Sequence, residues 1–487
     1  MKKYFGFLVA IALSAGFISC SDNEEDSNKI PVLQDDIPSA VVPANGFYIA
    51  NEDWFGHDNG TVNYFKNDGT IVYRAYRAVN AGETFGVTTQ YATIWGEYAY
   101  FVSKPGNRLV VADAETLKKK AVFTDLGGDG RAFTGVDDKI GYISLSNGIC
   151  QFNITELKLG ARVEGISEQI GTMCYANGNL YAVSPSKVYI IDVATNSVKQ
   201  TLTGSFNTLT QSKDGTIWIA ASDKFIKLNP VTLETEDMPY PENVSVGSSW
   251  GAWNAGSLCA STQKNVLYWT KLSGSGWSAV AKTIVKYDID SKSFNANLFE
   301  LGLDEGGKQQ VFYGAGIRIN PLTDEIIVTS RRTGYGDSYS YNWVYKLTAD
   351  GQELSKVFLL GDNGLGTEWG EANGQPDWDN RYYWFPSIPF FEDANKPEIL
   401  TNQILLSPGE TKTIDLTEKI IDADNISVSV IRKVEFVEND LVTYSLKDNV
   451  LTVTAKEKVG STECKMIAIS NGKKIEKKVR VDVTLDK

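Results

Sequence analysis

The chain has 487 residues, a single histidine and a formal net charge of −13 at pH 7. One imidazole is too few for a histidine-based catalytic triad or a multi-histidine zinc site within this chain. The acidic balance argues against a nucleic-acid partner, because phosphate binding requires a basic surface. The cysteines after Cys20 are widely spaced without a CxxC pair, so they predict no metal cluster and leave the disulfide state open.

Residues 1–19 have the layout of a lipoprotein signal peptide. Two lysines follow Met1, and the apolar segment 4–18 is shorter than the roughly 20 residues that a spanning helix needs. Cys20, directly after this segment, resembles the lipidated cysteine of a bacterial lipobox. We therefore expect the mature chain to reach the membrane through a lipid anchor only.

Residues 20–45 read as an acidic tether and linker. The acidic run 21–26 resembles the surface-export tag of Bacteroidetes lipoproteins, and it is equally typical of a solvated, disordered tether. Residues 27–45 contain three prolines and little hydrophobic pattern. Both interpretations agree with a position at the cell surface, on the outer membrane.

A two-strand phrase returns along residues 46–395, and its clearest copy is 178–197. It consists of an apolar strand, a short polar turn, a second strand ending in Asp or Asn, and a turn rich in Thr and Asn. The first strand of this phrase begins near residues 47, 98, 140, 180, 217, 266, 325 and 382, so successive copies are roughly 40–60 residues apart. This all-β period predicts a β-propeller, with a β-solenoid as the alternative.

The ends of the repeat region bear on the number of propeller blades. The copy near residue 382 has no second strand after it, and the copy near 47 has no clear strand before it. Because chain ends often complete one shared blade, we favour seven blades over eight.

Residues 396–487 differ in composition and pattern. They contain no tryptophan or histidine, and segments in which apolar and polar residues alternate predict strands at 426–431, 450–455 and 478–483. Period-two strands with polar turns suit a small Ig-like β-sandwich. We expect this domain to be a spacer or a protein-contact module.

The strand order sorts the loops by face. The four strands of a propeller blade run alternately up and down, in order from the axis outward, and we take the two-strand phrase as the second and third of them. Loops between these two strands therefore share one face with the connections between blades. The longest loops, at 51–60, 236–253, 271–281, 330–342 and 361–378, all fall on this face, which we call the loop face. The candidate ligand contacts on these loops are Trp54, Phe55, His57, Asp58, Asn59, Trp250, Trp253, Trp277, Arg331, Arg332, Tyr335, Tyr339, Tyr341 and Trp369.

These loops hold more than half of the eleven tryptophans. A large aromatic set on a loop surface favours a binding site, although single rings could instead fill the gaps between blades. His57 could be a turn residue, a ring contact or an axial ligand to a metal carried within the ligand. Glu368 and Glu371 could be imagined as a glycosidase pair, but no second signal supports catalysis, so we expect no enzymatic activity.

The phrase at residues 46–65, with the lipobox before it and the blade repeats behind it, resembles a family of Bacteroidetes propeller lipoproteins. The resemblance covers about 40–395 and does not reach the C-terminal domain. It implies capture of cobalamin or another corrinoid, delivered to a TonB-dependent transporter of the BtuB type, with no intrinsic cofactor or metal. The alternatives are a binder of a ferric siderophore, haem or a glycan, and a glycan-active enzyme.

Overall fold

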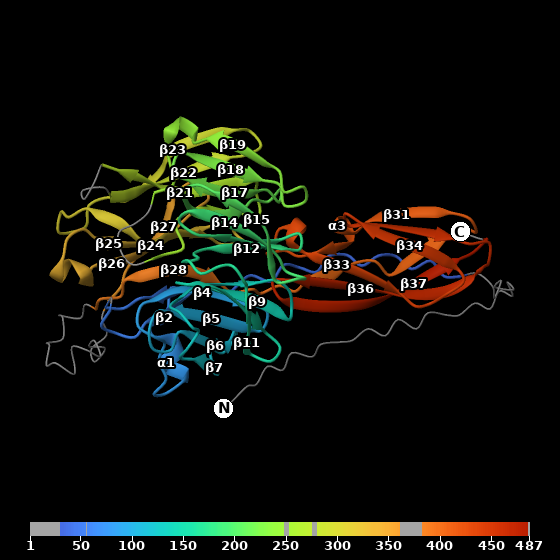
Figure 1. The fold of residues 1–487 in the computed structure, drawn as a ribbon, viewed down its shortest axis with the longest axis horizontal. Helices are drawn as coiled ribbons and strands as arrows, with labels where there is room; N and C mark the ends of the chain where they lie inside the picture. Colours follow the sequence, from blue (N-terminus) through green and yellow to red (C-terminus); the bar gives the residue numbers. More distant parts are fainter. Residues whose placement is uncertain (1–29, 55, 248–252, 275–279, 361–381, 486–487) are drawn as a thin grey trace, which may run out of the picture.

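The structure, a computed structural model, describes residues 30–54, 56–247, 253–274, 280–360 and 382–485. It is nearly all-β, as the repeat predicts. Figure 1 shows a broad body made by the repeat region beside an elongated C-terminal domain. No helix among these residues is long and apolar enough to cross a membrane.

Between residues 46 and 391 the chain forms four-stranded antiparallel sheets. One sheet contains β28 (Pro386–Phe391), β1 (Gly46–Asn51), β2 (Thr61–Lys66) and β3 (Ile71–Val72), in that order. The next contains β4 (Thr89–Trp95), β5 (Tyr98–Ser103), β6 (Leu109–Asp113) and β7 (Lys119–Phe123). It is followed by β8 (Gly130–Gly135), β9 (Ile140–Leu145), β10 (Gly148–Asn153) and β11 (Lys158–Arg162), and then by β12 (Met173–Ala176), β13 (Asn179–Val183), β14 (Lys187–Asp192) and β15 (Ser197–Thr203).

Three further sheets complete the series. They contain β16 (Phe206–Gln211), β17 (Ile217–Ala221), β18 (Lys224–Leu228) and β19 (Thr235–Pro239); β20 (Cys259–Ala260), β21 (Val266–Ser273), β22 (Val280–Asp288) and β23 (Ser293–Glu300); and β24 (Gln310–Ile319), β25 (Ile326–Arg332), β26 (Asn342–Leu347) and β27 (Glu353–Phe358). The first strands of successive sheets contact one another in a closed ring, which is the radial arrangement of a β-propeller.

The sheet containing β1 joins both ends of the repeat region. β28 pairs antiparallel with β1, with Tyr48 opposite Phe390. The innermost strand of this sheet, β28, therefore comes from the end of the repeat region, and its other three strands come from the start. This is expected for a blade that both ends of the region share. Short helices occupy the connections: α1 (Ala75–Val79), η1 (Pro241–Asn243) and η3 (Gly336–Ser340).

The turn after the third strand explains the recurring Asp or Asn of the repeat phrase. In the turns that begin at Asp113, Asn153, Asp192, Asn229 and Asp288, the side-chain oxygen accepts the backbone N–H three residues on, at 2.8–3.2 Å. Such side-chain bonds stabilise a reversal without a long loop. The recurrent sequence phrase is thus a local turn signal.

Burial follows the position of a strand within its sheet. All five residues of β13, a second strand, are buried, whereas β15, the fourth strand, alternates exposed and partly buried positions. The inner strands lie between neighbouring sheets and bury both faces, so their sequences are continuous apolar runs. This explains why the second and third strands dominate the sequence signal.

The C-terminal domain packs a four-stranded sheet and a three-stranded sheet over a common apolar core. The first sheet contains β30 (Gln403–Leu406), β37 (Lys473–Val483), β36 (Gly460–Ser470) and β33 (Ile431–Phe436), and the second β31 (Thr411–Asp415), β35 (Val450–Ala455) and β34 (Val442–Lys447). A short pair, β29 (Glu398–Ile399) and β32 (Ile420–Ile421), and the helix α3 (Leu416–Lys419) complete the domain.

One predicted strand of this domain is wrong. The segment 426–431 contains the 3-10 helix η4 (Ser427–Ser429), and a strand begins only at Ile431. The buried guanidinium of Arg432 donates to the carbonyls of Ser427 and Val430 at 2.8 and 3.0 Å. The same guanidinium also donates to the carbonyls of Leu416 and Ile420 at 3.0 and 2.8 Å, so it ties the segment to residues outside it and satisfies carbonyls that a sheet ladder would otherwise use. The predicted strands at 450–455 and 478–483 lie in β35 and β37.

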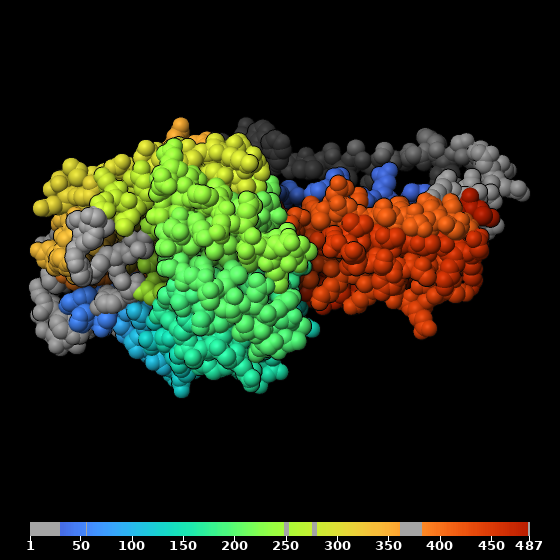
Figure 2. Space-filling model, turned by 45° about the horizontal axis from the view of Figure 1, so that its top comes forward, coloured from blue at the N-terminus to red at the C-terminus, as the bar shows by residue number. Residues whose placement is uncertain are grey.

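The C-terminal domain packs against one end of the propeller (Figure 2). Its contacts are with turns between first and second strands. The N–H of Gly96 donates to the carbonyl of Asn471 at 2.6 Å, and the amide of Gln263 donates to the carbonyl of Ala423 at 2.9 Å. One end of the central channel therefore meets the C-terminal domain, and the loop face lies at the other end.

Residues 30–45 lie extended along the C-terminal domain. The N–H of Val42 donates to the Asn395 side chain at 2.9 Å, near the propeller. Further back along the chain, the N–H of Asp36 donates to the carbonyl of Leu400 at 2.7 Å, and the N–H of Leu33 donates to the Gln403 side chain at 2.7 Å. The segment thus runs beside the domain, away from the propeller (Figure 1).

Candidate functional site

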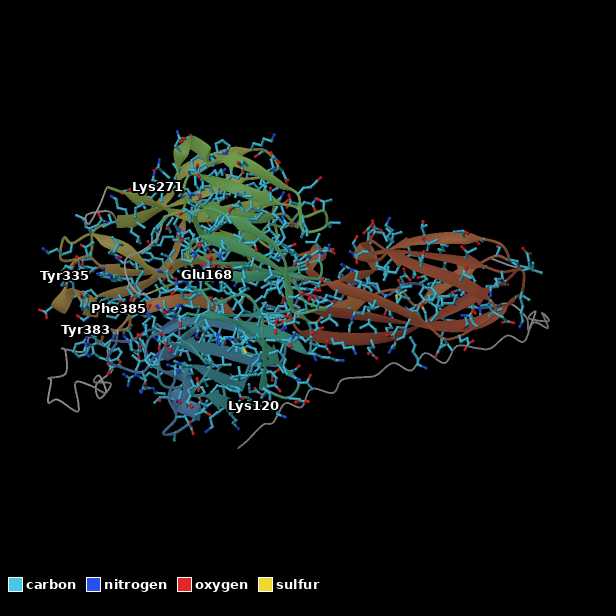
Figure 3. All side chains as sticks on the ribbon, in the orientation of Figure 1. Lys120, Glu168, Lys271, Tyr335, Tyr383 and Phe385 are labelled. Atoms are coloured by element: carbon cyan, nitrogen blue, oxygen red, sulfur yellow. The ribbon has the colours of Figure 1, made fainter. Side chains whose placement is uncertain are left out.

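Six aromatic rings from three segments meet on the loop face. Their centroids form a chain of contacts: Trp54 is 4.4 Å from His57 and 5.2 Å from Tyr383. Tyr339 continues the chain at 5.8 Å from Tyr383, 5.2 Å from Phe385 and 6.3 Å from Tyr335. Figure 3 shows Tyr335, Tyr383 and Phe385 at the end of the molecule away from the C-terminal domain. We call Trp54, His57, Tyr335, Tyr339, Tyr383 and Phe385 the aromatic cluster.

Main-chain pairing between distant segments positions this cluster. The N–H of Glu52 donates to the carbonyl of Phe385, and the N–H of Asp53 to that of Trp384, both at 3.0 Å. Asp53 and Phe385 have φ values of 55° and 44°, in the left-handed region that non-glycine residues rarely adopt. Because hydrogen bonds hold both backbones in this conformation, the rings are presented from a rigid support.

Exposure differs across the cluster. Tyr383 and Phe385 are buried, and Trp54 and Tyr339 pack against them with part of each ring accessible. Tyr335 is 77% exposed, and His57 is also exposed. The cluster therefore has a packed base and an accessible rim, the arrangement expected of a binding surface rather than of a closed core.

A buried carboxyl lies beneath the rings. Glu52 is 1% exposed and accepts a hydrogen bond from the Tyr313 hydroxyl at 3.1 Å, and the Tyr313 ring is 5.0 Å from Phe385. Burial raises the pKa of Glu52 to about 7, although the Tyr313 hydrogen bond and the charge of Lys104 lower it. Glu52 can therefore be neutral near pH 7, and a neutral carboxyl can donate as well as accept a hydrogen bond.

Cationic groups lie in this region, and one of them, Lys104, acts on the Glu52 carboxyl through its charge. The Arg331 guanidinium lies 6.0 Å from the Tyr313 ring, and burial lowers its pKa. Burial also lowers the pKa of Lys104 and of Arg131. Arg131 donates to the Gln169 side chain at 3.0 Å and lies 5.9 Å from the Trp253 ring. The charges of these buried or partly buried groups are weakly screened, so they can act on a bound polar ligand.

Five predicted contacts lie apart from the cluster: Asp58, Asn59, Trp253, Arg332 and Tyr341. Asp58 is buried and accepts from the Tyr382 hydroxyl at 3.3 Å, while the carbonyl of Asn59 accepts from Arg77 at 3.1 Å. Arg332 forms an ion pair with Asp304, and its guanidinium stacks 3.2 Å from the centroid of the Tyr341 ring. Trp253 is partly buried against the core near Arg131. These contacts join propeller segments to one another.

The structure thus brings together Trp54, His57, Tyr335 and Tyr339, with Arg331 nearby. Phe55, Trp250, Trp277, Trp369, the pair Glu368 and Glu371, and Cys20 lie outside the described residues. Tyr313, Tyr383 and Phe385 escaped sequence reasoning because they read as strand residues. The aromatic run at 382–385, directly after a long connection, is the signal that could have indicated them.

No group of His, Cys, Asp or Glu side chains within the described ranges could hold a metal ion. Cys150, Cys174, Cys259 and Cys464 are free thiols. The site therefore offers rings, hydroxyls and a buried carboxyl as its chemical groups.

Solved structures with a similar fold include a quinonprotein alcohol dehydrogenase-like protein from Bacteroides thetaiotaomicron VPI-5482. It is 17% identical with a TM-score of 0.51, and the match covers 72% of this chain and 78% of that one. At this identity the likeness concerns the fold alone, and it supports the propeller architecture.

Two weaker matches have TM-scores of 0.41. One is the extracellular domain of a putative hybrid two-component system from B. thetaiotaomicron, 11% identical over 87% of this chain and 62% of that one. The other is hydrazine synthase from Kuenenia stuttgartiensis, 9% identical over 53% of this chain and 76% of that one.

No curated protein matches the sequence significantly. The model of the family DUF5074, a domain of unknown function, matches residues 45–392. This range spans the whole propeller and ends just after β28, so it coincides with the structural unit that carries the aromatic cluster. The chain therefore belongs to the DUF5074 family.

Proposed function

We propose that this protein is a surface lipoprotein, anchored at Cys20, that captures cobalamin or another corrinoid on its loop face. It would pass this ligand to a TonB-dependent outer-membrane transporter of the BtuB type. The observation that carries the proposal is the aromatic cluster with its accessible rim at the end of the propeller away from the C-terminal domain. The resemblance of residues 46–65 to BtuG, a cobalamin-capturing lipoprotein, suggests the ligand class.

The finer architecture belongs to the same proposal. We assign the seven four-stranded sheets between residues 46 and 391 to seven blades, closed by the pairing of β28 with β1. The two packed sheets of the C-terminal domain are assigned to an Ig-like sandwich that serves as a spacer.

The chemistry of a corrinoid suits the described groups. A corrin is a broad apolar ring system that carries amide arms and binds cobalt at its centre. The rings of Trp54, Tyr335 and Tyr339 offer large apolar area at low entropic cost, and tyrosine hydroxyls offer hydrogen bonds at the edge. A neutral Glu52 beneath the cluster avoids placing a buried charge against the apolar ring system.

The course of the N-terminal segment supports capture away from the membrane. Residues 30–45 follow the C-terminal domain away from the propeller, so an anchor upstream of residue 30 would join the end opposite the loop face. The C-terminal domain would then act as a stalk that carries the loop face outward.

Calorimetry with cyanocobalamin tests the ligand. We expect saturable binding, nanomolar or tighter, with co-elution in gel filtration. The double variant W54A/Y339A should weaken binding about 100-fold, because buried aromatic anchors dominate affinity. Tyr444→Ala, at a half-exposed tyrosine in the C-terminal domain, is the matched control and should leave the affinity unchanged. Absence of both heat and co-elution would exclude the corrinoid; binding of haemin, a ferric siderophore or a glycan instead would assign the loop face to that ligand.

His57 has a separate test. Its imidazole is exposed at the rim, 4.4 Å from the Trp54 ring. If it coordinates cobalt, aquocobalamin should show a changed visible spectrum with the wild type and an unchanged one with His57→Ala. A spectrum that is identical with both proteins would leave His57 as a ring contact or turn residue.

A further inference from the structure

The central channel of the propeller contains a cavity of about 410 Å³ at the end that the C-terminal domain covers. First strands of the sheets line it with Tyr91 and Arg318, and the C-terminal domain contributes Asn425 and Asn471. This cavity lies at the opposite end of the propeller from the aromatic cluster. Any site within it is therefore distinct from the loop face.

Arg318 brings a positive charge into this cavity. Its Nη1 donates to the carbonyls of Gly256 and Ile317 at 2.9 and 2.7 Å. Within the described residues no carboxylate forms an ion pair with Arg318, and its Nε and Nη2 have no hydrogen-bond acceptor. Burial lowers the pKa of Arg318. Arg318 is partly buried, and a charge in such a place without a protein counterion favours an anion beside the guanidinium.

The Tyr91 hydroxyl offers a second donor. Tyr91 also lines the cavity, and its hydroxyl has no hydrogen-bond partner among the described residues. Both side chains line the same cavity, and burial raises the pKa of Tyr91 while the Arg318 charge lowers it, so the two groups lie near each other. We infer that the cavity binds a small monovalent anion, a carboxylate or a halide, between the Arg318 guanidinium and the Tyr91 hydroxyl.

Acidic groups occupy another part of the same cavity wall. Glu392, Asp393 and Asp424 also line it, and Lys473 lies 3.2 Å from Asp393. Burial is the main cause that lowers the pKa of Arg318, and none of these three carboxylates is among the groups that shift it. The cavity is therefore polarised, and its positive end is the end that would hold the anion. A single guanidinium matches one negative charge, which favours a monovalent anion over sulfate or phosphate.

The test titrates small monovalent anions onto the whole chain. The wild type is prepared in a low-salt sulfate buffer and titrated with sodium chloride or sodium acetate, and the variants are titrated identically to remove the general effect of ionic strength. Thermal unfolding should show a saturating rise of about 2 °C at tenfold excess over Kd, because the anion binds only the folded state. Arg318→Met should abolish this rise. Arg162→Met, at an exposed arginine outside the cavity, should keep it.

A second measurement, chloride NMR, gives its main result with the wild type alone. Broadening of the ³⁵Cl NMR line by the wild type should be reversed by acetate if one site takes both anions, and retained if the site selects halide. Tyr91→Phe should reduce the broadening at least threefold. A response of Arg318→Met equal to that of the wild type, or no broadening with the wild type, would overturn the inference. None of these readouts involves the loop face, so they stand apart from corrinoid binding.

Discussion

Replacing Glu52 with glutamine should stabilise the protein at alkaline pH. The amide keeps the shape of the side chain and can still accept the Tyr313 hydroxyl, but it cannot ionise. Burial raises the pKa of Glu52 from 4.5 to about 7, which is equivalent to a preference of roughly 3 kcal/mol for the neutral carboxyl in the folded state. This value is an upper estimate, because the protein relaxes around a buried charge.

The sign follows from the direction of the pKa shift. The pKa of the folded state lies above that of the unfolded state, so the proton stabilises the folded protein fully below about pH 4.5. This contribution is lost as the pH rises through about 7. We therefore expect Glu52→Gln and the wild type to have similar free energies of unfolding at pH 4.5. At pH 8 the variant should be more stable by about 1–3 kcal/mol.

Urea unfolding followed by tryptophan fluorescence at several pH values measures this difference. Glu164→Gln, at an exposed glutamate, controls for the loss of a surface charge and should follow the wild type throughout. A variant that is less stable than the wild type at pH 8, or a difference that does not change with pH, would refute the account of Glu52.

Three further predictions concern packing and reactivity. Arg432→Met should lower the free energy of unfolding of the C-terminal domain by about 3 kcal/mol, because buried carbonyls lose their donor. Urea unfolding measures this loss, and Lys433→Met, at an exposed lysine on the same strand, is the control. Gly135→Ala should cost about 3 kcal/mol or more, because its new Cβ would lie 2.0 Å from the Trp95 ring. Gly302→Ala, with open space around the glycine, should unfold like the wild type. Burial raises the pKa of the four described thiols, so a thiol reagent at pH 8 should label them in urea and leave them unlabelled in the native protein.

The repeat could be predicted because its signals are local. An apolar run followed by Asp or Asn indicates a buried strand and a side-chain-bonded turn, and both features form within ten residues. The strand order then determines which loops share a face. The segment 426–431 shows the limit of this reasoning, since the Arg432 guanidinium that bonds its 3-10 helix is also held by the carbonyls of Leu416 and Ile420, outside the segment.

The composition of the aromatic cluster was only partly predictable. Trp54, His57, Tyr335 and Tyr339 are loop residues and stand out by type. Tyr383 and Phe385 resemble core residues, and they reach the cluster only because residues 382–391 return to the start of the repeat region.

The sequence by itself determined the all-β repeat, the turn chemistry and the face on which the long loops lie, because each depends on neighbours along the chain. Only the tertiary structure decided which rings meet, that Glu52 lies beneath them, and that Arg318 and Tyr91 share a cavity closed by the C-terminal domain. Pairings such as Glu52 with Phe385 join residues more than 300 positions apart. Burial, and with it the protonation of Glu52, depends on how such distant segments pack, which local patterns do not encode.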